Sequence, residues 1–270
     1  MPRTVRTPDG RTLAVETAGD LAGHPVLVHM GTPNSRHLYG PNVADASERG
    51  LSPTARAMSG RSARRLRSTG SRCGDGRAAG PTCWPARPCS PISSRLPRHS
   101  RRLHHTAPKG LDWFAGMGED NVDEFQLLLS DQNAARAKID KERDEALAAS
   151  AGDLAQMLES LLTPVDAAVL EGKMAEYLSY ADHEGLAPGS QGWWDDSCAQ
   201  IRPWGFELAD IAVPVLVMHG RQDKFVPFAH GQWLATHIPG AEARLLDDDG
   251  HLTLTEHRVG EVHAWLSQRL

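Results

Sequence analysis

The 270-residue sequence lacks long hydrophobic runs and has only four cysteines. No stretch approaches the roughly 18–20 apolar residues that a membrane span needs, so we expect no transmembrane helix. The cysteines, at positions 73, 83, 89 and 198, match neither a zinc site nor a disulfide framework. The N-terminal residues MPRTVRTPDGRTLAVETAG have no apolar core after their first two arginines, which argues against a secretory signal. We therefore expect a cytoplasmic protein without a membrane partner.

The segment 51–109 lacks the residues from which the interior of a domain is built. It has no Val, Glu, Phe or Tyr and a single carboxylate, Asp75, but twelve Arg, nine Ser and seven Pro. Its formal charge is +12, whereas that of the whole chain is −5. Because it has almost no β-branched or aromatic residues, this segment cannot form the middle of a hydrophobic core. We expect it to be disordered, so that the central strands of the fold are missing here.

The sequence on both sides of this segment contains strand patterns. Apolar and polar residues alternate over 11–18 after the turn Pro8–Gly10, which predicts the second strand of a hairpin. Residues 25–29 (PVLVH) and 213–219 (VPVLVMH) are continuous apolar runs that precede glycine-containing loops, as is typical of buried parallel strands. Residues 241–246 predict a further short strand.

Helical periodicity lies between these strands. Residues 123–149, 153–162 and 165–180 predict helices, the last with Pro164 in its first turn, and 256–270 predicts a terminal amphipathic helix. Strands that alternate with helices indicate a mainly parallel, doubly wound α/β sheet. The helices ahead of the second buried strand would form an inserted lid.

Three loops follow predicted strands, at the sheet edge where open α/β sheets bind ligands. The first, HMGTPNSR, is either an ordinary turn or one that directs the backbone N–H of Thr32 at a developing oxyanion. The second, HGRQDKFVP, carries Asp223, which either orients a histidine or caps a helix. The third, DDDGHLTL, carries His251, a general base or a surface histidine. An acid after one late strand and a histidine after the next follow the Asp-then-His order of one hydrolase fold.

With these motifs the flanks resemble the α/β-hydrolase family, in particular its proline-iminopeptidase-like and esterase-like members with a helical lid. The resemblance covers residues 1–50 and 110–270, and extends throughout GWWDDSCAQIRPWGFELADIAVPVLVMHGRQD, from Gly192 to Asp223. It implies that 1–50 and 193–270 are two parts of a hydrolase core and that 110–192 is the lid.

The resemblance also implies a chemistry. Asp223 would be the acid of a catalytic triad, His251 the base and Thr32 an oxyanion donor, with no metal or organic cofactor. The substrate would be a small ester or amide. Tryptophans of the lid and its flank would line the acyl pocket or belong to the plain core: Trp113, Trp193, Trp194 and Trp204.

The nucleophile that this family requires is missing. Its G-x-S-x-G elbow should lie between the first and second loops, and no such pentapeptide exists there. The nearest sequence, Gly60–Arg64 (GRSAR), ends in arginine where the crowded turn needs a small residue, and no apolar strand precedes it. Ser62 is therefore a poor candidate, and the catalytic triad is incomplete.

We hypothesise that residues 51–109 are translated in a displaced reading frame. The codons of Cys73–Thr82 permit the displaced reading VWGRSGGGPH, which is a strand end, an elbow and a helix start. Those of Thr54–Arg61 permit DRPGYxGS, which is similar to the family's loop after the fourth strand, and those of His105–Gly110 permit PYGAEG, which rejoins the present frame at Gly110. In this displaced reading, the serine of the elbow falls at Arg77. If the Arg77 codon is CGN, the displaced codon must end in CG. That allows Ser, Pro, Thr or Ala but neither Asp nor Cys, so the encoded enzyme would be a serine hydrolase.

Two other interpretations stay open. An authentic Arg- and Ser-rich linker could bind nucleic acid or another polyanion. However, its only Phe, Tyr or Trp is Trp84, so it has no aromatic interleaving for base stacking, and we expect no nucleic-acid partner. A hydrolase scaffold without its nucleophile could also bind a ligand without turning it over.

Overall fold

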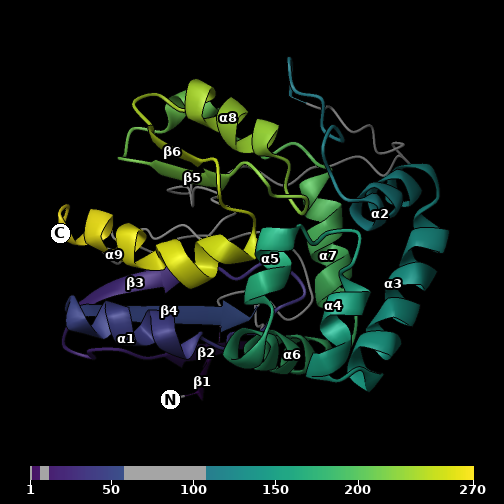
Figure 1. The fold of residues 1–270 in the computed structure, drawn as a ribbon, viewed down its shortest axis with the longest axis horizontal. Coiled ribbons are helices and arrows are strands. Elements are labelled where there is room, and N and C mark those ends of the chain that lie inside the picture. The colour runs from purple at the N-terminus through teal and green to yellow at the C-terminus, as the bar shows by residue number, and fades with distance from the viewer. Residues whose placement is uncertain (1, 7–11, 58–107) are drawn as a thin grey trace.

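Six strands form two sheets in the part of the chain that the structure, a computed structural model, describes: residues 2–6, 12–57 and 108–270 (Figure 1). One sheet has the order β1-β2-β4-β3, and the other pairs β5 with β6. The β1–β2 and β2–β4 pairs are antiparallel, whereas β3–β4 and β5–β6 are parallel. The strands are β1 (Pro2–Arg6), β2 (Thr12–Thr17), β3 (His24–Val28), β4 (Leu51–Ala57), β5 (Leu216–Gly220) and β6 (Glu242–Leu246).

One hydrophobic cluster joins the two sheets. It contains Val26 of β3, Leu51 of β4 and Leu216 of β5, together with Trp265 and Leu266 of the last helix. Among the described strands, β3 lies at the edge of its sheet and β5 pairs only with β6. The two sheets therefore share one core, and no described strand pairs with both β3 and β5.

The beginning of the Arg-rich segment corrects the prediction that all of 51–109 is disordered. Residues 51–57 form β4, which pairs with β2 on one side and β3 on the other. Leu51 and Ala55 are fully buried. Backbone pairing on both sides, together with small or apolar side chains, forms this strand although the composition of the segment argues against it. The rest of the segment, residues 58–107 with Arg77, lies outside the described residues.

The predicted helices are found, but several are interrupted. The pattern over 123–149 becomes two helices that meet at Asp131, whose carboxylate accepts the N–H groups of Asn133 and Ala134 and so caps the second helix. Pro164 lies in the first turn of its helix, as predicted, but this helix ends at Val169. The helices of this region, which we call the helical segment, are α2 (Glu119–Ser130), α3 (Gln132–Ala148), α4 (Leu154–Met157), α5 (Pro164–Val169), α6 (Gly172–Leu186) and α7 (Gln191–Gln200).

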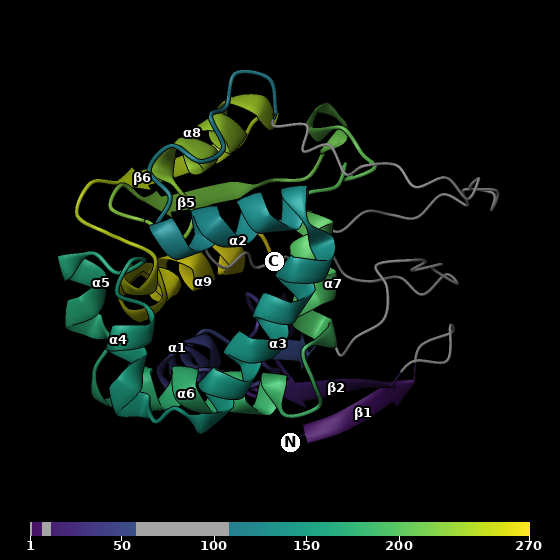
Figure 2. The same cartoon turned by 90° about the vertical axis from the view of Figure 1, so that its right-hand side faces the viewer.

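The helical segment lies beside both sheets at one end of the molecule (Figures 1 and 2). The remaining helices pack around the strands: α1 (Gly40–Glu48), α8 (Phe228–His237) and α9 (Val259–Ser267), with a π-helical stretch, Leu254–Arg258, leading into α9. In the described ranges, no helix combines the length and the apolar character that crossing a bilayer requires.

Candidate active site

Asp223 and His251 lie next to each other, on the loops that follow β5 and β6. His251 Nδ1 donates to Asp223 Oδ2 at 2.8 Å. The Asp223 side chain is completely buried, whereas that of His251 is 20% exposed. Because β5 and β6 are parallel neighbours, their carboxyl ends bring the two loops to the same edge. The structure thus brings together the acid and the histidine that the sequence singled out.

The two side chains stabilise each other's charged form. Burial alone would lower the pKa of His251, but the charge and the hydrogen bond of Asp223 outweigh burial and raise it. Burial would raise the pKa of Asp223, but the His251 charge and hydrogen bond outweigh it and hold that pKa below its ordinary value. The ring of Phe225 stacks on His251, with 4.6 Å between ring centroids and 22° between planes. With Nδ1 bound to Asp223, Nε2 is the nitrogen that can accept a proton.

His219, at the end of β5, holds the loop that carries Asp223. Its Nε2 lies 2.8 Å from the Val226 carbonyl oxygen, which can only accept, so this nitrogen carries the proton. The Val226 N–H donates in turn to Asp223 Oδ1 at 2.8 Å. Burial lowers the pKa of His219, which keeps the ring neutral although it stands 3.6 Å from Asp223 Oδ2. In the sequence, His219 is only the first residue of a loop motif, and nothing there indicates this role.

Asp166 of α5, which the sequence analysis did not single out, binds the turn that carries His251. Its carboxylate is fully buried and accepts the backbone N–H groups of His251, Leu252 and Thr253 at 2.9, 2.8 and 3.1 Å. A Cβ atom at Gly250 would lie 2.2 Å from Asp166 Oδ2, so the approach requires glycine there. In the sequence, an aspartate in the first turn of a helix indicates only favourable helix electrostatics.

Thr32 lies in the turn after β3, where its peptide bond to Pro33 is cis. Its side chain is hydrogen-bonded to Asp196 of α7; burial raises the pKa of Asp196 to about 6, although this bond opposes the shift. The residues that follow also attach to the helical segment: the Ser35 N–H donates to the Ala181 carbonyl at 3.1 Å, and Arg36 pairs with Glu184 at 2.6 Å. The helical segment therefore holds the turn from which Thr32 was predicted to donate.

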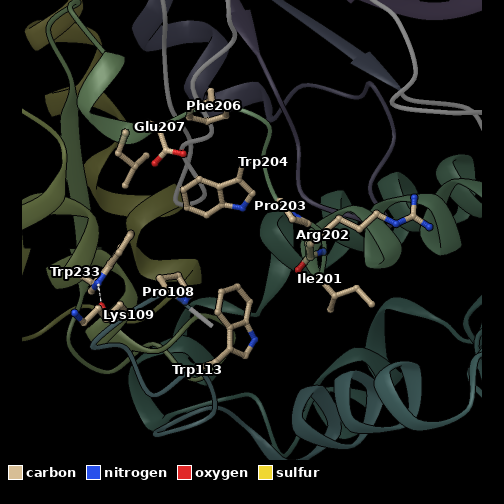
Figure 3. Close-up of a pocket in the computed structure, with 12 residues that line it drawn as sticks. Pro108, Lys109, Trp113, Ile201, Arg202, Pro203, Trp204, Phe206, Glu207 and Trp233 are labelled. Carbon is tan, nitrogen blue, oxygen red and sulfur yellow. Dashed lines mark hydrogen bonds between the residues drawn. The ribbon is translucent and has the colours of Figure 1, made fainter. Parts of the chain in front are cut away.

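An aromatic pocket of about 300 Å³ lies between α8 and the stretches of chain that precede α2 and follow α7 (Figure 3). Trp113, Trp204, Phe206 and Trp233 gather around it. It contains neither member of the acid–histidine pair. Trp113 and Trp204, two of the tryptophans expected to line an acyl pocket, thus line a pocket that includes neither Asp223 nor His251.

The other two predicted tryptophans lie in α7. Trp194 packs against the cluster of Phe125 and Leu128, and Trp193 is hydrogen-bonded to Glu124. Within the described ranges, no group of three or more His, Cys, Asp or Glu side chains is arranged to hold a metal ion.

Comparisons with known sequences find partial relatives. No family model matches the sequence. A stretch of 54 residues is 39% identical to a pimeloyl-[acyl-carrier protein] methyl ester esterase of Aromatoleum aromaticum, over 20% of this chain and 22% of that protein. A stretch of 90 residues is 32% identical to a 2-hydroxy-6-oxononadienedioate/2-hydroxy-6-oxononatrienedioate hydrolase of Klebsiella pneumoniae, over 33% of this chain and 30% of that protein. The chain thus spans less than a third of the length of these curated relatives.

Solved structures match over nearly the whole chain. An esterase from Rhodococcus sp. ECU1013 superposes with a TM-score of 0.54 at 16% identity, covering 98% of both chains. A bromoperoxidase from Bacillus anthracis gives a TM-score of 0.52 at 14% identity over 100% of both chains. A thermophilic esterase from Thermogutta terrifontis gives 0.52 at 15% identity, over 99% of this chain and 98% of that one. These likenesses show that the chain has the α/β-hydrolase fold.

Proposed function

We propose that the gene encodes a serine hydrolase for small esters or amides, and that the chain as translated lacks the nucleophile and is inactive. The hydrogen bond between Asp223 and His251 carries this proposal. A buried carboxylate that fixes Nδ1 leaves Nε2 to act as the general base toward a hydroxyl group. The names of the partial relatives, an esterase and a hydrolase, support this class of reaction.

The mechanism follows from these groups. The serine hydroxyl oxygen attacks the carbonyl carbon of the substrate and passes its proton to His251 Nε2, while Asp223 stabilises the resulting imidazolium. The N–H of Thr32 and the N–H after the serine would bind the oxyanion. When the tetrahedral intermediate collapses, the leaving alcohol or amine takes the proton from His251. Water then cleaves the acyl-enzyme by the same steps, which releases the acid and restores the serine.

The sequence between β3 and β5 supports the part of the proposal that concerns the missing nucleophile. In this family the elbow follows a central strand, and no described strand pairs with both β3 and β5. The sequence between them contains no G-x-S-x-G, and the expected serine falls at Arg77. We propose that a displaced reading frame removed both the strand and the elbow.

The proposal is tested by sequencing the gene across codons 50–110 and expressing the chain in the corrected frame. We expect the corrected reading to contain a G-x-S-x-G pentapeptide after an apolar run. A gene that encodes the present residues without interruption, in independent isolates, would contradict the displaced frame.

We expect the chain as translated to aggregate more readily than the frame-corrected chain. A sheet without its central strands leaves strand edges unpaired and apolar faces uncovered. Size-exclusion chromatography with light scattering, on both chains at equal concentrations, measures this difference. Equal monomer fractions and equal melting temperatures would argue against a damaged core.

We expect the frame-corrected enzyme to prefer esters to aminopeptidase substrates. The lid sequence does not separate these classes, but one partial relative is a methyl ester esterase. The measurement is kcat/KM for p-nitrophenyl butyrate and for proline β-naphthylamide. A ratio that favours the amide would assign the enzyme to the iminopeptidase-like group instead.

A further inference from the structure

We propose that Asp166 is a positioning residue, through which the helical segment holds the backbone of His251 in place. The inference rests on the proposed role of His251 as the base. Its geometry involves only described residues and does not depend on the missing nucleophile. No step of the proposed mechanism uses Asp166, although its charged side chain is fully buried.

Three hydrogen bonds connect Asp166 to the turn. Its Oδ2 accepts from His251 N, and its Oδ1 accepts from both Leu252 N and Thr253 N. A buried carboxylate is costly unless hydrogen bonds replace its hydration. Three charge-assisted bonds meet that requirement and fix the carboxylate against the turn.

Leu252 and Thr253 form the helical turn that leads into the π-helical stretch Leu254–Arg258, and this turn explains why the carboxylate comes from a distant segment. The first N–H groups of a helix have no partner within it, and a side chain just ahead of the helix usually caps them. Here the residue ahead is His251, whose ring is bonded to Asp223. Asp166, 85 positions earlier in the chain, supplies the cap instead, and its negative charge suits the positive end of the helix.

Side-chain packing connects the same turn to the helical segment independently. Leu252, the residue after His251, is buried in a cluster with Leu154, Leu170 and Ala175. The turn is therefore held to the helical segment by three hydrogen bonds and by an apolar contact. Asp223, in contrast, is held by the loop after β5, through Val226 and His219. A shift of α5 would thus displace the backbone of His251 relative to Asp223.

The carboxylate also acts on the imidazole through its charge. The negative charge of Asp166 adds to that of Asp223 in favouring protonated His251, and so contributes to its raised pKa. His219 is a further titratable group at this site, and the charges of Asp223 and His251 both act on its pKa. A change at Asp166 should therefore alter both the exchange of the turn amides and the titration of His251.

The test is Asp166→Asn in the chain as translated, followed by NMR. Asn keeps the shape but removes the charge and turns an NH₂ group toward backbone donors. We expect the His251 pKa, from its Cε1–Hε1 signal, to fall, and the Leu252 and Thr253 amides to exchange at least about tenfold faster. His251→Gln assigns the signal. The matched control is Asp153→Asn, which removes an exposed capping carboxylate on Ser150 and should leave His251 unchanged.

An Asp166→Asn protein that folds and shows the parent's His251 pKa and amide exchange would overturn the proposal. If this variant does not fold, hydrogen exchange of the unaltered protein decides: protected Leu252 and Thr253 amides support it, and exchange as fast as that of exposed amides overturns it. In the frame-corrected enzyme, Asp166→Asn should lower kcat by about 10²-fold with little change in KM. An inactive frame-corrected enzyme with a normal Asp166 effect on His251 would refute the proposed function alone.

Discussion

Correcting the reading frame is expected to raise the rate of p-nitrophenyl butyrate hydrolysis by about 10⁶-fold over the chain as translated. Loss of the nucleophile alone removes about this much rate in a serine protease whose other triad members remain. Asp223 and His251 are already paired in the present chain, so the correction adds the group that they would activate. The rate is measured with both chains purified under the same conditions. A fluorophosphonate probe, which reacts with activated serines, gives a second readout.

The controls separate the serine from the rest of the corrected segment. Replacing the serine that takes the place of Arg77 by alanine should abolish both turnover and labelling while leaving the corrected fold intact. Labelling of any serine in the folded chain as translated would contradict the proposal, because that chain would then hold a nucleophile of its own. A corrected chain that folds but neither labels nor turns over would also contradict it.

Much of the fold could be predicted from hydrophobic patterns. The runs at 25–29 and 213–219 correspond to β3 and β5, which begin or end within three residues of the predicted bounds. Burial on both faces, which such runs predict, is found for β5 but not for β3, where Val26 is buried and Leu27 is exposed in the described structure. The break at Asp131 could not be predicted in this way, because periodicity continues across it and a capping side chain sets the boundary.

The strand at 51–57 shows what composition cannot indicate. β4 includes Pro53 and two alanines, Ala55 and Ala57, which disfavour a central strand by propensity. Its neighbours β2 and β3 nevertheless supply backbone partners on both sides. Pairing between distant segments, with the buried side chains of Leu51 and Ala55, outweighs the unfavourable propensity.

The candidate site was predictable where it follows the chain and unpredictable where it depends on distant contacts. Asp223 and His251 each follow a strand, and parallel strands bring successive loops to one edge, so their proximity could be inferred. Asp166 lies 85 positions from His251 and in a different element, and its sequence context is that of an ordinary helix start. Its role becomes visible only when three backbone N–H groups are found to converge on it.

Asp223→Asn in the frame-corrected enzyme is expected to lower kcat by about 10⁴-fold, the cost of the same change in a serine protease triad. An amide holds the imidazole in the wrong tautomer and no longer stabilises the imidazolium. Measuring kcat and KM should show the loss almost entirely in kcat. The matched control is Asp247→Asn. Asp247 is an exposed residue that precedes His251 in the same loop and pairs with Arg221. We expect its replacement to change kcat by less than about twofold.

The pH dependence of the rate tests the direction in which Asp223 shifts the pKa of His251. The reaction needs neutral His251, so the rate should rise with pH and level off above the pKa of His251, which Asp223 raises above its ordinary value. Asp223→Asn removes the negative charge, so the midpoint should move to lower pH while the plateau falls. NMR titration of His251 in the chain as translated, with and without Asp223→Asn, should show the same downward shift of its pKa without any turnover. A midpoint that stays in place, or moves upward, would mean that Asp223 does not control the protonation of His251, and the acid–base pairing on which the proposed chemistry depends would have to be abandoned.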